Sequence, residues 1–102
     1  MSAAEKKAAS YLGLAQKAGK LKSGEFLTEK AVKDGSAKLV IISKDASDNT
    51  GGKIEDACKY RNIPFMRLFE KEDLGHIIGK EMRVVLAVTD EGFAKAILKC
   101  FE

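Results

Sequence analysis

Two runs of apolar residues constrain the fold of this chain more than any other feature. Leu39–Ile42 holds four consecutive large aliphatic side chains, three of them β-branched, and Val84–Val88 is apolar throughout. A strand with one face in water alternates apolar and polar residues, so an uninterrupted run is typical of a strand buried on both faces. We therefore expect strands over Lys38–Ser43 and Met82–Thr89, each inside a sheet that is covered on both sides.

Helical patterns alternate with these strands. Apolar side chains recur at helical spacing over about 2–19, 24–34, 50–61, 70–79 and 90–101, and extended pieces are expected over Lys20–Ser23 and Pro64–Leu68. Helices interleaved with buried strands predict an α/β fold, a three-layer α/β/α sandwich around a four-stranded sheet. A chain of 102 residues is long enough to fold as one domain, 1–102, without a disulfide or a metal.

Composition limits where the protein acts. No apolar run approaches the ~18 residues of a membrane span, and the first residues contain no apolar signal-peptide region. Cys58 and Cys100 are too few and too far apart to form a disulfide framework or a zinc knuckle. We therefore expect a cytoplasmic protein with reduced cysteines and no membrane partner.

Known catalytic and metal-binding patterns are absent from the sequence. The segment Asn49–Lys53 resembles a phosphate-binding loop, but Ser47 stands where that loop needs glycine and Ile54 where it needs Ser or Thr. His76 is the only histidine, which leaves no Ser-His-Asp, Cys-His or zinc-ligand spacing. The sequence thus predicts no catalytic residues, no metal and no cofactor.

Positive charge and one aromatic residue gather in the second helical segment. Residues 17–44 carry seven lysines and three acidic residues, a net charge of +4, whereas the whole chain has a net charge of +3. A helical wheel places Phe26 between Lys30 and Lys33, opposite an inward face that includes Leu27. Lysines bind phosphates and an exposed ring can stack on a splayed base, so this surface favours RNA.

Three other interpretations of this surface remain open. The lysines can form an ordinary solvated face, or Phe26 can fold back onto a neighbouring loop. Phe26 can also anchor the chain in a pocket of a partner protein.

Several short segments, taken in order, carry a resemblance to a known family. They are Lys20–Gly24, Thr28, Lys30–Val32, Gly35–Ile42, Asn62–Pro64, Leu74–Gly75, Gly79 and Glu81. Together they resemble the kink-turn RNA-binding ribosomal proteins, whose members include L-seven-Ae and L-thirty-e. Gly79–Glu81 and Arg83–Asp90 are most similar to the bacterial YlxQ-like branch of this family.

The resemblance implies a mixed sheet, no catalysis, and a monomer that binds ribosomal or other structured RNA, with the ribosome or translation factors as further partners. In this family RNA is held by the turn after the first strand, the second helix, and the loop before the last strand. Together with the basic surface, this implies a set of RNA-binding residues. They are Lys20, Lys22, Ser23, Gly24, Glu25, Phe26, Lys30, Lys33, Lys80, Glu81, Met82 and Arg83.

The chain departs from the family pattern at the residues that recognise kink-turns. The family places Asn-Glu where this chain has Phe26-Leu27, and that pair hydrogen-bonds to sheared G·A base pairs. Apolar side chains can neither donate nor accept such bonds. Met82 and Arg83 also replace small apolar residues in the last loop. The resemblance therefore implies RNA binding, but kink-turn specificity does not follow from it. The alternative is a protein–protein interaction module of the translation machinery, anchored by Phe26.

Overall fold

The computed structural model describes all residues, 1–102, as five helices and four strands. In chain order the elements are α1 (Ala3–Lys17), β1 (Leu21–Ser23), α2 (Glu25–Lys33), β2 (Leu39–Ile42), α3 (Asp48–Arg61), β3 (Phe65–Arg67), α4 (Lys71–Ile77), β4 (Val85–Val88) and α5 (Glu91–Lys99).

The four strands form one mixed sheet in the order β1-β4-β2-β3. β4 is antiparallel to both β1 and β2, whereas β2 and β3 are parallel. Every residue of the central strands β2 and β4 is buried, but the edge strands β1 and β3 contain half-buried and exposed residues. The expectation that the two apolar runs form strands buried on both faces is confirmed.

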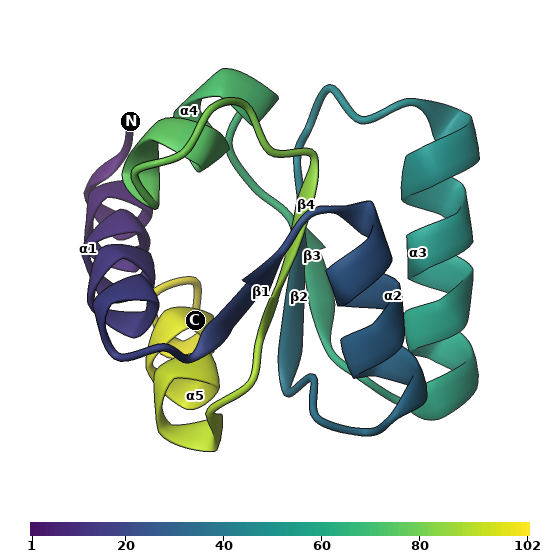
Figure 1. Ribbon diagram of the computed structural model, residues 1–102. Coiled ribbons are helices and arrows are strands. Elements are labelled where there is room, and N and C mark those ends of the chain that lie inside the picture. Colours follow the sequence, from purple (N-terminus) through teal and green to yellow (C-terminus); the bar gives the residue numbers. More distant parts are fainter.

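Two layers of helices cover the sheet. Figure 1 shows α1, α4 and α5 on one face and α2 and α3 on the other. Successive residues of β2 alternate between the layers: Leu39 and Ile41 join the cluster under α1, α4 and α5, whereas Val40 and Ile42 join the cluster under α2 and α3. The predicted three-layer α/β/α sandwich is confirmed, and so is the mixed sheet.

Two elements begin two or more residues away from the predicted start. β4 begins at Val85 rather than Met82, because the backbone amide of Arg83 donates to Lys71 O in α4 (3.0 Å). Of residues 82–84, only Val84 still bonds beside β2, where its carbonyl accepts from the Ser43 amide (2.7 Å). α3 begins at Asp48 rather than Thr50, because the Ser47 hydroxyl accepts from the Thr50 amide (3.1 Å) and caps the helix two residues earlier.

The first helix begins as its sequence predicts. Ser2 Oγ accepts from the amide of Glu5 (3.1 Å), and Glu5 Oε1 accepts from the amide of Ser2 (2.9 Å), a reciprocal capping box. None of the five helices combines the length and the apolar character that a membrane crossing requires.

Candidate nucleic-acid interface

The turn from β1 to α2 lies at one end of the sheet. Gly24, which precedes α2, has φ = 94°, a backbone conformation that favours glycine, and its amide donates to Val85 O (2.9 Å) at the start of β4. No side chain caps α2. The first amides of α2 can therefore donate hydrogen bonds to an anionic ligand, and Glu25 is the only acidic residue in this turn of the helix.

The loop before β4 lies beside this turn. Arg83 Nε donates to Ser23 Oγ (3.3 Å), and Arg83 NH1 donates to Met82 O (3.0 Å). Lys80, Glu81 and Met82 are exposed, whereas Arg83 is half-buried. The structure thus places side by side two of the segments that the family resemblance implies for RNA binding, and Arg83 holds them in contact.

Helix α4 packs closely against this loop at Gly75. A Cβ atom on Gly75 would overlap the Glu81 carbonyl and lie 2.8 Å from Met82 Cα, so only glycine lets the helix and the loop approach this closely. The conformation of residues 80–83 therefore depends on a helix that sequence analysis did not connect with the interface.

The outer face of α2 carries Phe26, whose side chain is 77% exposed as predicted. A shallow hollow of about 360 Å³ is lined by Phe26, Glu29, Lys30, Lys33 and Asp34. A second hollow of about 260 Å³ is lined by Lys22, Leu27, Lys30, Ala31, Asp34 and Ser36. Lys30 lines both hollows, so the lysines and the ring form one continuous surface.

Acidic groups on this surface are already engaged. Ser36 donates hydrogen bonds to Asp34, and the nearby charges of Lys30 and Lys22 also help to lower the pKa of this carboxyl. Glu29 turns toward α3, where Lys53 Nζ lies 2.8 Å from its Oε1 and has its pKa raised by that contact. None of Lys22, Lys30 and Lys33 forms an ion pair, so their ammonium groups are free to bind an anion.

The predicted RNA-binding residues fall into three places. Ser23, Gly24, Glu25, Phe26 and the segment Lys80–Arg83 lie at the end of the sheet. Lys22, Lys30 and Lys33 follow the flank of α2. Lys20 lies apart: its carbonyl accepts from the Thr89 amide (2.9 Å) at the far end of β1, and four residues of extended chain separate it from Gly24 by ~13 Å.

Comparison with known proteins identifies the family. The Ribosomal protein L7Ae/L30e/S12e/Gadd45 family matches residues 6–98. The chain belongs to this family. The resemblance inferred from the sequence is confirmed.

Two relatives at the sequence level carry the same name. The chain is 45% identical over 91 residues to RNA-binding protein YlxQ of Bacillus subtilis (strain 168), which covers 89% of this chain and 91% of the relative. It is 40% identical over 96 residues to RNA-binding protein YlxQ of Enterococcus faecium, which covers 94% of this chain and 92% of that relative.

Solved structures share the fold. A Bacillus halodurans protein of unknown function matches with a TM-score of 0.89 at 40% identity, covering 92% of this chain and 95% of that one. A Giardia lamblia 15.5kD RNA binding protein matches with a TM-score of 0.80 over 98% of this chain and 86% of that one. At 19% identity, this second likeness shows the fold alone.

Leu27 does not lie on the inward face of α2 where the sequence predicted it. It was expected on the inward face of the helix, but its side chain is 42% exposed, while Thr28, Ala31 and Val32 are the buried residues of α2. A helical wheel shows which residues share a face of the helix. It does not show which part of that face is buried, because burial depends on how α2 packs against β4 and α3. Leu27, Phe26 and the 56% exposed Met82 thus add apolar surface to this part of the protein.

Two groups that sequence analysis considered for chemistry lie elsewhere. Burial raises the pKa of the Cys58 thiol to about 11, with Glu55 adding to the shift, so this thiol is protonated at neutral pH. His76 is exposed in the last turn of α4. The structure contains no group of three His, Cys, Asp or Glu side chains that could hold a metal ion.

Proposed function

We propose that this protein binds structured RNA at the end of the sheet where the β1–α2 turn meets loop 80–83. Membership of the L7Ae family and the names of the two YlxQ relatives support an RNA partner. The observation that carries the proposal is the bond from Arg83 to Ser23, because it joins both segments beside an exposed ring and unpaired lysines.

Each part of this surface suits a different part of an RNA. The uncapped amides of α2 and the ammonium groups of Lys22, Lys30 and Lys33 bind phosphates. Phe26 stacks on an unpaired base, with Met82 as a neighbouring apolar contact. Glu25 and Glu81 accept hydrogen bonds from base amino groups, whereas Ser23, Gly24 and Arg83 hold the backbone in place.

The apolar pair Phe26-Leu27 indicates which RNA features are recognised. Neither side chain can hydrogen-bond to the edges of G·A pairs, so a loop or bulge with a splayed base fits this chain better than a kink-turn. A monomeric state, a cytoplasmic location and an association with the ribosome or translation factors stay predictions.

The phosphate contacts are tested by removing lysines one at a time. Lys30→Ala and Lys33→Ala should each weaken binding to ribosomal RNA hairpins and flatten the dependence of log K on log salt by about one unit, because each lost contact releases one counterion fewer. Filter binding between 50 and 200 mM salt measures both effects. Lys99→Ala, on the exposed side of α5, is the matched control and should change neither.

The stacking contact is tested at Phe26. Phe26→Ala should weaken RNA binding by ~1–3 kcal/mol with almost no change in the salt slope, because a ring contributes stacking and no charge. The double variant Phe26→Asn/Leu27→Glu should gain preference for a kink-turn over a plain hairpin. Because Leu27 is exposed, a glutamate there leaves no buried charge, and the circular dichroism spectrum should stay that of the parent.

One pattern of results would favour a different function. If the lysine variants and Phe26→Ala all bind RNA like the parent, while Phe26→Ala abolishes a protein complex isolated from cells, then the surface is a protein–protein interaction module.

A further inference from the structure

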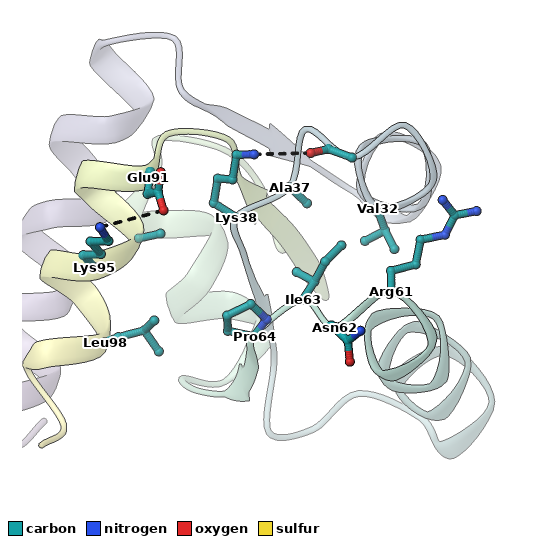
Figure 2. A pocket seen from close by; sticks show the side chains of 12 residues that line it. Val32, Ala37, Lys38, Arg61, Asn62, Ile63, Pro64, Glu91, Lys95 and Leu98 are labelled. Atoms are coloured by element: carbon teal, nitrogen blue, oxygen red, sulfur yellow. Dashed lines mark hydrogen bonds and ion pairs between the residues drawn. The ribbon is translucent and has the colours of Figure 1, made fainter.

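The largest hollow of the molecule lies at the end of the sheet opposite the β1–α2 turn. This groove, of about 590 Å³, is found where α2 and α3 end and α5 begins (Figure 2). Its location at the opposite end of the sheet follows from the backbone: Lys38 N donates to Val88 O at the end of β4, whereas Gly24 N donates to Val85 O at its start. Its volume lies within the range of protein binding pockets, about 300–1,000 Å³.

The groove has an apolar floor that spans both layers of helices. Val32, Ala37 and Ile63 come from one side of the sheet end and Ala94 and Leu98 from α5 on the other, with Pro64 between them. No aromatic ring lines it, so it offers no surface on which a nucleic-acid base can stack. The floor therefore favours an aliphatic or aromatic side chain of a ligand, which loses contact with water when it binds there.

The rim of the groove is positively charged. Lys38 Nζ donates to Gly35 O (3.4 Å), and Arg61 NH1 donates to Lys33 O (2.8 Å), so carbonyls near the end of α2 hold both cations in place. An ammonium group has three donors and a guanidinium has five, which leaves donors for a ligand.

The third cation of the rim is paired only weakly. Lys95 lies 3.8 Å from Glu91, the only acidic residue that lines the groove, and both side chains are exposed. Such a pair is readily exchanged for another partner in water. The rim of the groove thus carries three cations, Lys38, Arg61 and Lys95, and one carboxylate, Glu91.

We propose that this groove binds an extended, acidic segment of a partner protein. One apolar side chain of the segment lies on the floor, and flanking carboxylates bind Lys38, Arg61 and Lys95. Exposed Gly35, Asn62 and Pro64 leave the groove open, whereas a small-molecule pocket encloses most of its ligand. An extended chain can instead lie across such an opening. The groove adjoins the lysine-bearing flank of α2, because Arg61 on its rim donates to the carbonyl of Lys33 (2.8 Å).

The test begins with a phage library of random 12-residue peptides selected against the folded, full-length protein. We expect enriched peptides to combine an apolar residue with at least two carboxylates. Binding of the synthetic peptides is then measured by fluorescence anisotropy. Lys38→Glu/Lys95→Glu should weaken it at least tenfold, and Leu98→Ser should do the same by removing part of the floor.

The matched control makes the same change of charge outside the groove. Lys7→Glu/Lys99→Glu reverses two exposed lysines that do not line the groove but line a neighbouring hollow, which Lys95 also borders. Peptide affinity should stay within twofold of the parent. Lys38 and Lys95 are both exposed, so their reversal tests the groove even if Leu98→Ser impairs folding.

Three results would overturn the proposal. They are a library that yields no enriched acidic peptide, peptides that bind the Lys38→Glu/Lys95→Glu variant as tightly as the parent, and a tenfold loss of RNA affinity in that variant but not in its charge-matched control. The last would assign the groove to the RNA surface. The RNA-binding function itself is tested separately by Lys30→Ala, so the two proposals can fail independently.

Discussion

Ile41→Ala should lower the free energy of unfolding by about 2–4 kcal/mol. Ile41 is fully buried in β2, paired with Leu86 of β4 on one side and Met66 of β3 on the other, and its side chain packs in the cluster under α1, α4 and α5. Truncation leaves a cavity that neighbours held in the middle of a sheet cannot close. Urea denaturation followed by circular dichroism measures the loss.

Two companion variants make this result specific. Val85→Ala removes a buried side chain that packs under α2 and α3, so a comparable loss is expected there if both faces of the sheet are covered. Leu14→Ala, on an exposed side chain of α1, should change stability by less than about 0.5 kcal/mol. A loss as small as that for Ile41→Ala would mean that its face of the sheet is open to water.

Gly75→Ala should destabilise the protein by about 1–3 kcal/mol and also weaken RNA binding. In most helices this substitution is stabilising, because alanine costs less conformational entropy than glycine. Here the added methyl group meets backbone atoms of Glu81 and Met82, which cannot rotate away as a side chain can. Loop 80–83 must therefore shift, and with it the contact between Arg83 and Ser23. Thermal melting and filter binding measure the two effects.

Gly52→Ala is the matched control for this prediction. Gly52 also lies inside a helix, α3, but nothing lies within 4 Å of the position of a Cβ atom. Its replacement should stabilise the protein by roughly 0.5–1 kcal/mol and leave RNA binding unchanged. If Gly75→Ala behaves in the same way, loop 80–83 does not depend on close contact with α4.

Much of the interface could be predicted from sequence because its signals are local. Phe26 departs from the apolar stripe of its own helix, and only the nine residues of α2 are needed to see this. The contact between the β1–α2 turn and loop 80–83 could not be predicted in this way. Sixty residues separate Ser23 from Arg83, and nothing in the intervening sequence fixes their distance.

Other features of the interface could not be predicted from the sequence. Leu27 was assigned to the core because periodicity alone cannot separate the edge of a stripe from its centre. Gly75 belongs to the family resemblance, but its close contact with Glu81 depends on how α4 packs. Glu29 weakens the basic surface less than its charge suggests, because it pairs with Lys53 of α3.

The sequence by itself determined the layered α/β architecture, since runs such as Leu39–Ile42 are stable only when helices exclude water from both faces of a sheet. It also placed Phe26 on the side of its helix that faces away from the apolar stripe, and the structure shows that the ring is exposed. Tertiary structure alone decided where β4 begins, which way Leu27 points, and that a charged groove forms where α2, α3 and α5 meet. Each of these depends on contacts between residues distant in the chain, and such contacts leave no periodic pattern in the sequence.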